Sequence, residues 1–231
     1  ADARLCYFTA GESDAAAQHA DAVGAGPSVL ARLRVGAHRA DARAESGPLA
    51  ERVAAVIFTS GTTGASKGVL VSHAGLLQFA QASSASRALT AQDRAYAYLP
   101  MTHIFGLGTV LMASLYACTA LLMRSRFDPA DVVHALAHEG LTQLQGPPAL
   151  FNRLMDHCAA HGLHHPPAPA LRYLYTGAAP LDLRLKARVE AAFGRPLHQG
   201  SGLPEYADAL GLRRLGHRHD DTSAGTLVEG V

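Results

Sequence analysis

The stretch that decides the fold and chemistry of this chain is Thr59-Ser60-Gly61-Thr62-Thr63-Gly64-Ala65-Ser66-Lys67-Gly68. It combines three glycines and a cluster of hydroxyl side chains with one lysine. Glycines let a backbone turn tightly and approach a ligand closely. Successive amide N–H groups in such a turn form a concave anion site, and a lysine ammonium is a point charge suited to phosphate. The residues therefore predict a loop that grips a polyphosphate, with a Gly/Ser/Thr hairpin carrying a solvated lysine as the alternative.

Apolar residues flank this loop on both sides. Residues 53–58 (VAAVIF) predict a buried strand before it, and residues 69–71 (VLV) form a second short apolar run after it. The common P-loop has glycine directly before its lysine and Ser or Thr directly after it. Here Ser66 precedes the lysine and Gly68 follows it, so the loop belongs to another class.

The stretch resembles the phosphate loop of the adenylate-forming superfamily, which contains acyl-CoA and aryl-CoA synthetases, luciferases and the adenylation domains of peptide synthetases. The family pattern is Thr-Ser-Gly-Thr-Thr-Gly-x-Pro-Lys-Gly, from which this chain departs only at Ser66. The resemblance implies that the loop holds the phosphates of ATP. The implied nucleotide-binding residues are Thr59, Ser60, Gly61, Thr62, Thr63, Gly64 and Lys67.

A second motif, residues 99–106 (LPMTHIFG), resembles a family signature in which the histidine borders the acyl pocket beside the reacting carboxylate. The resemblance assigns that role to His103. From the residues alone, a histidine amid apolar neighbours either orients a ligand oxygen or is a core histidine bonded to backbone.

A third motif, residues 175–181 (YTGAAPL), resembles the Gly-Ala-Ala-Pro-Leu turn of the family. The resemblance implies that the backbone of Gly177, Ala178 and Ala179 lies against the adenine and the acyl group, where small residues are needed for close packing. By itself the stretch is equally compatible with an ordinary strand-to-helix turn capped by Asp182.

A fourth motif, residues 199–205 (QGSGLPE), is similar to the family pattern Gln-Gly-Tyr-Gly-x-Thr-Glu. It implies that Gln199 and Gly200 bind the adenine side of the nucleotide, and that Glu205 holds Mg²⁺ together with Thr62. Two positions depart from the pattern, Ser201 for tyrosine and Pro204 for threonine. Because proline offers neither a hydroxyl nor an N–H, we expect weakened ATP affinity.

The remaining chain alternates strands, turns and helices. We predict strands over residues 4–9, 28–35, 94–99, 119–123, 141–144, 171–175 and 196–199, and helices over residues 13–24, 72–84, 107–116, 128–140, 147–160 and 182–194. This order predicts an α/β fold, a mainly parallel sheet with helices on both faces. The resemblance makes it part of the large N-terminal domain of an adenylate-forming enzyme. Ligands bind beyond the carboxyl ends of such strands, so the four motifs should converge on one site.

Composition sets further bounds. The net charge of +1, with acids and bases interspersed, argues against a nucleic-acid or anionic-membrane partner. The three cysteines share no motif spacing, which predicts buried thiols in a reducing, cytoplasmic compartment.

The uncharged residues 106–123 are long enough to span a membrane, but the surrounding strand–helix order favours a buried helix and strand. His157 and His161 are spaced i, i+4 near Cys158; without a third ligand they favour a solvated helix face over a metal site.

Two segments are expected: a partial N-terminal α/β segment with its connector over residues 1–52, and an incomplete AMP-binding core over residues 53–231. In the family, a ribose-binding aspartate, a hinge and a small domain with a catalytic lysine follow downstream. No counterpart occurs in these residues, so the resemblance implies a portion of a longer enzyme, inactive in isolation.

The resemblance implies ATP-dependent activation of a small-molecule carboxylic acid to an acyl-adenylate, followed by thioester formation. Lys67, His103 and Glu205 are the implied catalytic residues, with Thr62 and Glu205 at Mg²⁺. Coenzyme A is the expected acceptor, because the pairing of the second and third motifs looks like acyl-CoA or aryl-CoA ligases. A carrier protein is the alternative acceptor. A non-catalytic remnant that binds a nucleotide or a partner is the competing hypothesis.

Overall fold

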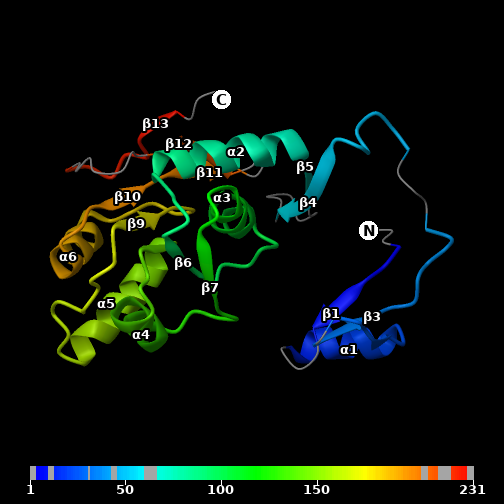
Figure 1. Cartoon of the computed structure of the whole chain (residues 1–231), viewed down its shortest axis with the longest axis horizontal. Coiled ribbons are helices and arrows are strands. Elements are labelled where there is room, and N and C mark those ends of the chain that lie inside the picture. The colour runs from blue at the N-terminus through cyan, green and yellow to red at the C-terminus, as the bar shows by residue number, and fades with distance from the viewer. Residues whose placement is uncertain are drawn as a thin grey trace. The chain divides into compact units, whose positions relative to one another are not determined.

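The computed structural model describes residues 4–9, 13–30, 32–42, 46–59, 67–203, 208–212 and 220–227. The chain divides into two compact units, Ala1–Ala50 and Glu51–Val231. In Figure 1 the first unit is blue, and the second runs from cyan to red.

The first unit packs one helix beside a small antiparallel sheet with strand order β1-β3-β2. Its elements are β1 (Tyr7–Thr9), α1 (Asp14–Ala22), β2 (Gly26–Pro27) and β3 (Leu33–Val35). The hydroxyl of Ser13 caps α1 by accepting the N–H of Ala16. Arg34 on β3 donates to the carboxylate of Asp21 at 2.7 Å. The strand predicted over residues 28–35 is thus confirmed only in its last three residues.

The second unit is built on five strands in the order β10-β9-β8-β6-β7, and every neighbouring pair is parallel. The strands are β6 (Arg94–Ala97), β7 (Ala120–Met123), β8 (Gln143–Gly146), β9 (Tyr173–Thr176) and β10 (Leu197–Gln199). Each falls on a predicted strand, and its ends lie within two residues of the predicted ends. The predicted α/β fold with a parallel sheet is confirmed.

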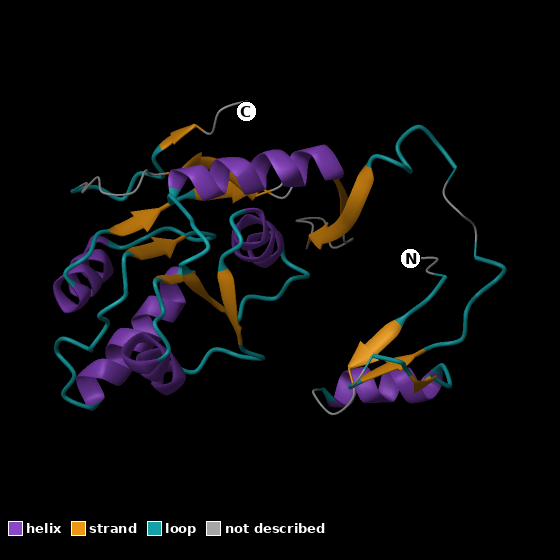
Figure 2. Cartoon of the chain, in the orientation of Figure 1, coloured by secondary structure: helices purple, strands orange, loops and turns teal. Residues whose placement is uncertain are grey.

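Helices cover both faces of this sheet, as predicted (Figure 2). Helices α4 (Pro129–His138), α5 (Pro148–Ala160) and α6 (Leu183–Phe193) pack on one face. The other face carries α2 (His73–Ser86), the π-helix η1 (Phe105–Met112) and α3 (Ala113–Tyr116). The caps explain several boundaries: Asp128 begins α4 just before a proline, and Gly194, at φ 62°, ends α6.

The face under α4, α5 and α6 is apolar. Leu144, Leu174 and Leu197 project from three neighbouring strands onto Phe151 of α5 and Val189 of α6. All of these side chains are at most 2% exposed. Hydrophobic burial is therefore the main interaction that holds this layer together.

The opposite face is polar at its centre. Gln143, Gln145, Tyr173 and His198 project from β8, β9 and β10 and are at most 2% exposed. Burial raises the pKa of Tyr173, so its hydroxyl stays protonated, although the nearby arginine charges oppose the shift. The α2 helix contributes buried Ser83, Ser84 and Arg87 to the same layer.

The predicted phosphate loop joins two antiparallel strands, β4 (Val53–Thr59) and β5 (Lys67–Ser72). The prediction of a buried strand is wrong for half of β4. Ile57 packs against the α2 side and is 6% exposed, whereas Val56 and Phe58 are 46% and 62% exposed. A strand turns alternate side chains to opposite faces, and only one face of this hairpin is covered within the part of the chain that the structure describes.

A short antiparallel sheet, order β11-β12-β13, follows the parallel one. It consists of β11 (Ser201–Leu203), β12 (Asp208–Leu212) and β13 (Thr226–Leu227).

An ion pair joins the amino end of β6 to the segment before β9. Arg172 donates to both carboxylate oxygens of Asp93, and the hydroxyl of Thr142 donates to one of them. Burial alone would raise the pKa of Asp93, but these hydrogen bonds and the N–H of Thr90 outweigh it and lower the pKa to about 2.

The cysteine prediction is wrong at two positions. Cys6 and Cys118 are exposed, and only Cys158 is buried; all three thiols are free. Cys118 lies in the turn between α3 and β7 at φ 57°, where little covers it.

Residues 106–123 form η1, α3 and β7, as the predicted helix and strand required. Among the described residues, no helix has the length and apolar character needed to cross a membrane.

Candidate active site

His103 lies in the tight loop that follows β6. Its Nδ1 accepts the backbone N–H of Phe105 at 3.1 Å, so in the neutral ring the proton resides on Nε2. Gly106 closes this loop, because a Cβ there would overlap the carbonyl of Pro100. The His103 side chain is exposed, which contradicts the alternative of a core histidine. The ring therefore presents a hydrogen-bond donor outside the core.

The Gly-Ala-Ala-Pro-Leu turn begins where β9 ends. Gly177 is buried, and Ala178 adopts φ 65°, a left-handed conformation that is costly for a residue with a side chain. Strained backbone of this kind often occurs at ligand sites. Ala179 is exposed and does not line the pocket described below.

Gly200 follows β10 directly, and its N–H donates to the carbonyl of Thr176 at 3.0 Å. A Cβ at Gly200 would overlap the hydroxyl of Tyr175, and one at Gly177 would lie 3.3 Å from the Gly200 carbonyl oxygen. The two motifs are thus packed backbone to backbone. Only glycine fits at position 200.

These segments enclose one pocket of about 160 Å³ at the carboxyl edge of the parallel sheet. It is lined by His103, Ile104, Phe105, Tyr175, Gly177, Ala178, Gly200 and Gly202. Three of the four sequence motifs therefore meet at one place, the edge where ligands bind in open α/β sheets.

Two aromatic side chains that the sequence analysis did not single out as site residues form a wall of this pocket. Phe105 and Tyr175 pack edge to face, with ring centroids 5.8 Å apart. Both are at most 5% exposed. Their sequence signal was an aromatic residue within the quoted stretch of each motif, a residue type that is otherwise typical of core packing.

Two buried oxygen atoms near the pocket have no hydrogen-bond partner among the described residues, Gln199 Oε1 and Thr176 Oγ1. The two residues are paired in register across β9 and β10. A buried oxygen that lacks a protein donor is expected to meet water or a ligand donor. The amide of Gln199 therefore fits a ligand that offers an N–H, such as an adenine amino group.

Of the phosphate-loop residues, Thr59 and Lys67 lie inside the described ranges, and residues 60–66 lie outside them. Thr59 and Lys67 are directly paired at the end of the β4–β5 hairpin where the loop connects the two strands. The Thr59 hydroxyl donates to the Lys67 carbonyl at 3.5 Å, and the Lys67 side chain is exposed. The loop between them is thus closed by strand pairing, and its lysine is accessible.

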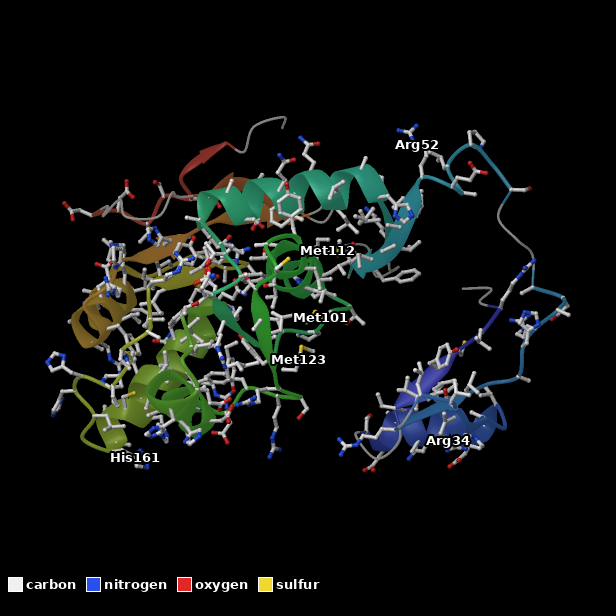
Figure 3. All side chains as sticks on the ribbon, in the orientation of Figure 1. Arg34, Arg52, Met101, Met112, Met123 and His161 are labelled. Atoms are coloured by element: carbon white, nitrogen blue, oxygen red, sulfur yellow. The ribbon has the colours of Figure 1, made fainter. Side chains whose placement is uncertain are left out.

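The predicted metal ligands Thr62 and Glu205 lie outside the described residues, as does Pro204. Among the residues that are described, no three potential ligands come together to hold a metal ion. The Nδ1–H of His161 donates to the His157 carbonyl at 2.8 Å, and Figure 3 shows His161 at the end of α5. Cys158 points instead into the apolar core, so it does not share a face with these histidines.

The family model described as AMP-binding enzyme matches residues 5–231. This chain therefore belongs to the AMP-binding enzyme family, which agrees with the resemblance to the adenylate-forming superfamily. It is 31% identical over 167 residues to 4-coumarate–CoA ligase-like 6 of Arabidopsis thaliana, a match covering 70% of this chain and 29% of that protein. It is 30% identical over 186 residues to 4-coumarate–CoA ligase-like 3 of Oryza sativa subsp. japonica, covering 77% and 31%.

Solved structures of similar proteins agree with this family membership. ATP-bound MatB from Rhodopseudomonas palustris matches with a TM-score of 0.71 and 26% identity, over 84% of this chain and 37% of that one. O-succinylbenzoate coenzyme A synthetase (MenE) from Bacillus subtilis, in complex with ATP and magnesium ion, matches with a TM-score of 0.68 and 25% identity, over 78% and 36%. The chain thus spans about a third of the length of the relatives it matches.

Proposed function

We propose that this chain carries the ATP-binding and carboxylate-binding residues of an acid–thiol ligase. The reaction joins a small-molecule carboxylic acid to AMP with release of pyrophosphate, and then transfers the acyl group to a thiol. Coenzyme A is the proposed acceptor, because the curated relatives described above are CoA ligases by name.

One observation carries this proposal: His103, the Gly177 turn and Gly200 line a single pocket at the carboxyl edge of the sheet. These residues come from three separate segments of a chain that belongs to the AMP-binding enzyme family. Chance placement of three matched motifs would not bring them together.

The roles follow from the chemistry of each group. Lys67 and the amides of residues 60–64 hold the β- and γ-phosphates, and Thr62 and Glu205 supply oxygen ligands to Mg²⁺. The backbone at Gly177, Ala178 and Gly200 packs against the adenine. The Nε2–H of His103 donates to the carboxylate and orients it toward the α-phosphate. Catalysis then rests on positioning and charge neutralisation.

The competing function is binding without catalysis. Pro204 favours it, because the family carries a threonine there and proline lacks both a hydroxyl and an N–H. Loading of a carrier protein in place of CoA is the other alternative.

The test uses the open reading frame that encodes this chain, expressed in full. Pyrophosphate release is measured with ATP, Mg²⁺ and a panel of aliphatic and aromatic carboxylic acids, with acid-free reactions as the control. Acid-dependent release followed by CoA-dependent thioester formation supports the proposal. ATP binding without acid-dependent pyrophosphate release would establish the non-catalytic alternative. Thioester formation only on an added carrier protein would show that the carrier protein, and not CoA, is the acyl acceptor.

A further inference from the structure

We infer that Arg87 is a positioning residue: its buried guanidinium ties the π-helix η1 to the sheet and thereby sets the geometry of the pocket wall formed by His103, Phe105 and Tyr175. The inference rests on the proposed function for its catalytic meaning, but not for its structural test. Arg87 belongs to none of the four motifs.

Arg87 is 1% exposed, although it is the C-cap residue of α2, where an arginine is usually solvated. Its guanidinium bridges three elements. Nη1 donates to Gln145 Oε1 on β8 at 2.8 Å, and Nη2 donates to the Thr109 carbonyl of η1 at 2.8 Å. Nε and Nη2 also donate to the carbonyl and hydroxyl of Ser83 in α2. The rigid fork of donors makes this three-way grip possible.

The helix that Arg87 binds through the Thr109 carbonyl, η1, is of an unusual type. A π-helix is rare and is frequently found at functional sites, and η1 continues directly into the α-helix α3. Its hydrogen-bond spacing must change at that junction, where Ala113 lies, four residues after Thr109. Ser84, one turn before Arg87, donates to the Ala113 carbonyl at 2.9 Å. The last turn of α2 thus binds η1 and α3 through two side chains. Figure 3 labels Met112, the last residue of η1, beneath α2.

Two of the three elements that Arg87 bridges, η1 and β8, lead to the pocket. The first residue of η1 is Phe105, whose N–H fixes the His103 ring through Nδ1. On the sheet side, Gln145 is paired in register with Tyr175, which lines the pocket and packs on Phe105. Arg87 therefore links the helix that presents His103 to the strand pair that presents Tyr175. A change in its hydrogen bonding should move these two walls relative to each other.

The alternative is that Arg87 only stabilises the fold, so two variants separate the roles. Arg87→Lys keeps the positive charge and the aliphatic stem, but one ammonium cannot bridge β8, η1 and α2 as the fork does. The control is Leu144→Ala. Leu144 lies between Gln143 and Gln145 on β8 and faces the apolar layer, so its loss lowers global stability without touching η1.

The experiment compares the parent chain with both variants under native conditions, in which amide hydrogens exchange through local opening of the structure. Amide hydrogen exchange is measured across η1 and, as a reference, across α4 and α5. The ¹⁵N shifts of the His103 ring report its tautomer and its bond to Phe105. In Arg87→Lys we expect η1 amides to exchange about ten-fold faster, the loss expected for a hydrogen bond to a charged group, with α4 and α5 changed less. The His103 ring shifts should move toward those of a mixture of tautomers.

Leu144→Ala should accelerate exchange in α4 and α5 at least as much as in η1, and leave the His103 ring shifts of the folded state unchanged. Parent-like exchange in η1 and parent-like His103 shifts in Arg87→Lys would overturn the inference. So would an exchange pattern that matches that of Leu144→Ala. None of these readouts uses ATP or a carboxylic acid, so failure of the proposed enzymatic function would leave this test intact.

Discussion

The two faces of the parallel sheet solve the same packing problem with different chemistry. Under α4, α5 and α6, strand residues such as Leu144 and Leu174 belong to one large hydrophobic cluster. Under α2, η1 and α3, β8 presents Gln145 to the buried Arg87, which also bonds to Ser83. An apolar layer supplies stability but tolerates many arrangements, whereas a hydrogen-bonded layer fixes distances and directions. The polar layer lies on the side of η1, whose first residues line the pocket, so precision is concentrated where the proposed chemistry needs it.

The largest effect is expected on the apolar face. Phe151→Ala removes a fully buried ring from the cluster between α5 and the sheet, and should lower the free energy of unfolding by about 3–5 kcal/mol. Denaturant titration measures this loss. A cost below about 1 kcal/mol would mean that the apolar layer is loosely packed and that the contrast between the faces is false.

The ion pair between Asp93 and Arg172 should make the stability of the fold depend on pH. Asp93 has a folded-state pKa of about 2, below its unfolded value of about 3.9. Its contribution to stability is therefore present above pH 4 and is lost as the pH falls toward 2. We expect Asp93→Asn to cost of the order of 1–2 kcal/mol at neutral pH and to flatten the acid dependence of stability in that window. Unfolding curves collected between pH 2 and pH 7 check this, and an unchanged acid limb in the variant would refute it.

Two neighbouring glutamines sharpen the comparison. Neither polar atom of the Gln143 side chain has a partner among the described residues, so Gln143→Met should be neutral or stabilising by up to about 1 kcal/mol. Gln145 accepts from Arg87, so Gln145→Met leaves a charged donor short of a partner and should destabilise by about 1–3 kcal/mol. The difference in unfolding free energy between the two variants is the measurement. Equal costs would mean that the polar layer is not specifically bonded.

The smallest effect on stability is expected at the pocket itself. His103 is exposed and makes one backbone contact, so His103→Ala should change the free energy of unfolding by about 0.5 kcal/mol or less. In the full-length protein it should slow adenylate formation and leave ATP binding nearly intact. An unfolded variant, or one that has lost nucleotide binding, would show that the histidine serves the fold instead.

Most of the fold could be predicted because its signals are local. Asp128 before a proline and Gly194 after a helix mark ends that the structure reproduces. The exposure of Phe58 could not be predicted, because a continuous apolar run does not tell on how many faces a strand is covered. The burial of Arg87 was also hidden, since an arginine at a helix end usually faces water.

The candidate site likewise has features that the sequence predicts and features that it does not. The motifs placed His103, Gly177 and Gly200 at one pocket, because the carboxyl ends of parallel strands share an edge. Tyr175 was not singled out, because an aromatic residue in a strand normally signals core packing. The π-helix has no sequence signal of its own, since its spacing differs from that of an α-helix by one hydrogen-bond step. The roles proposed for the site residues, including Thr62 and Glu205, stay predictions.

The central claim is that this chain holds the phosphate site for ATP, and one calorimetric comparison tests it. ATP·Mg²⁺ is titrated into the parent chain, into Lys67→Ala and into the control Arg52→Ala. Arg52 is exposed and immediately precedes β4, at the end opposite the loop (Figure 3). We predict weak binding by the parent and by Arg52→Ala, and an affinity about ten-fold or more lower in Lys67→Ala, with unfolding free energies within about 0.5 kcal/mol of one another. Equal nucleotide affinity in Lys67→Ala and the parent would contradict the account.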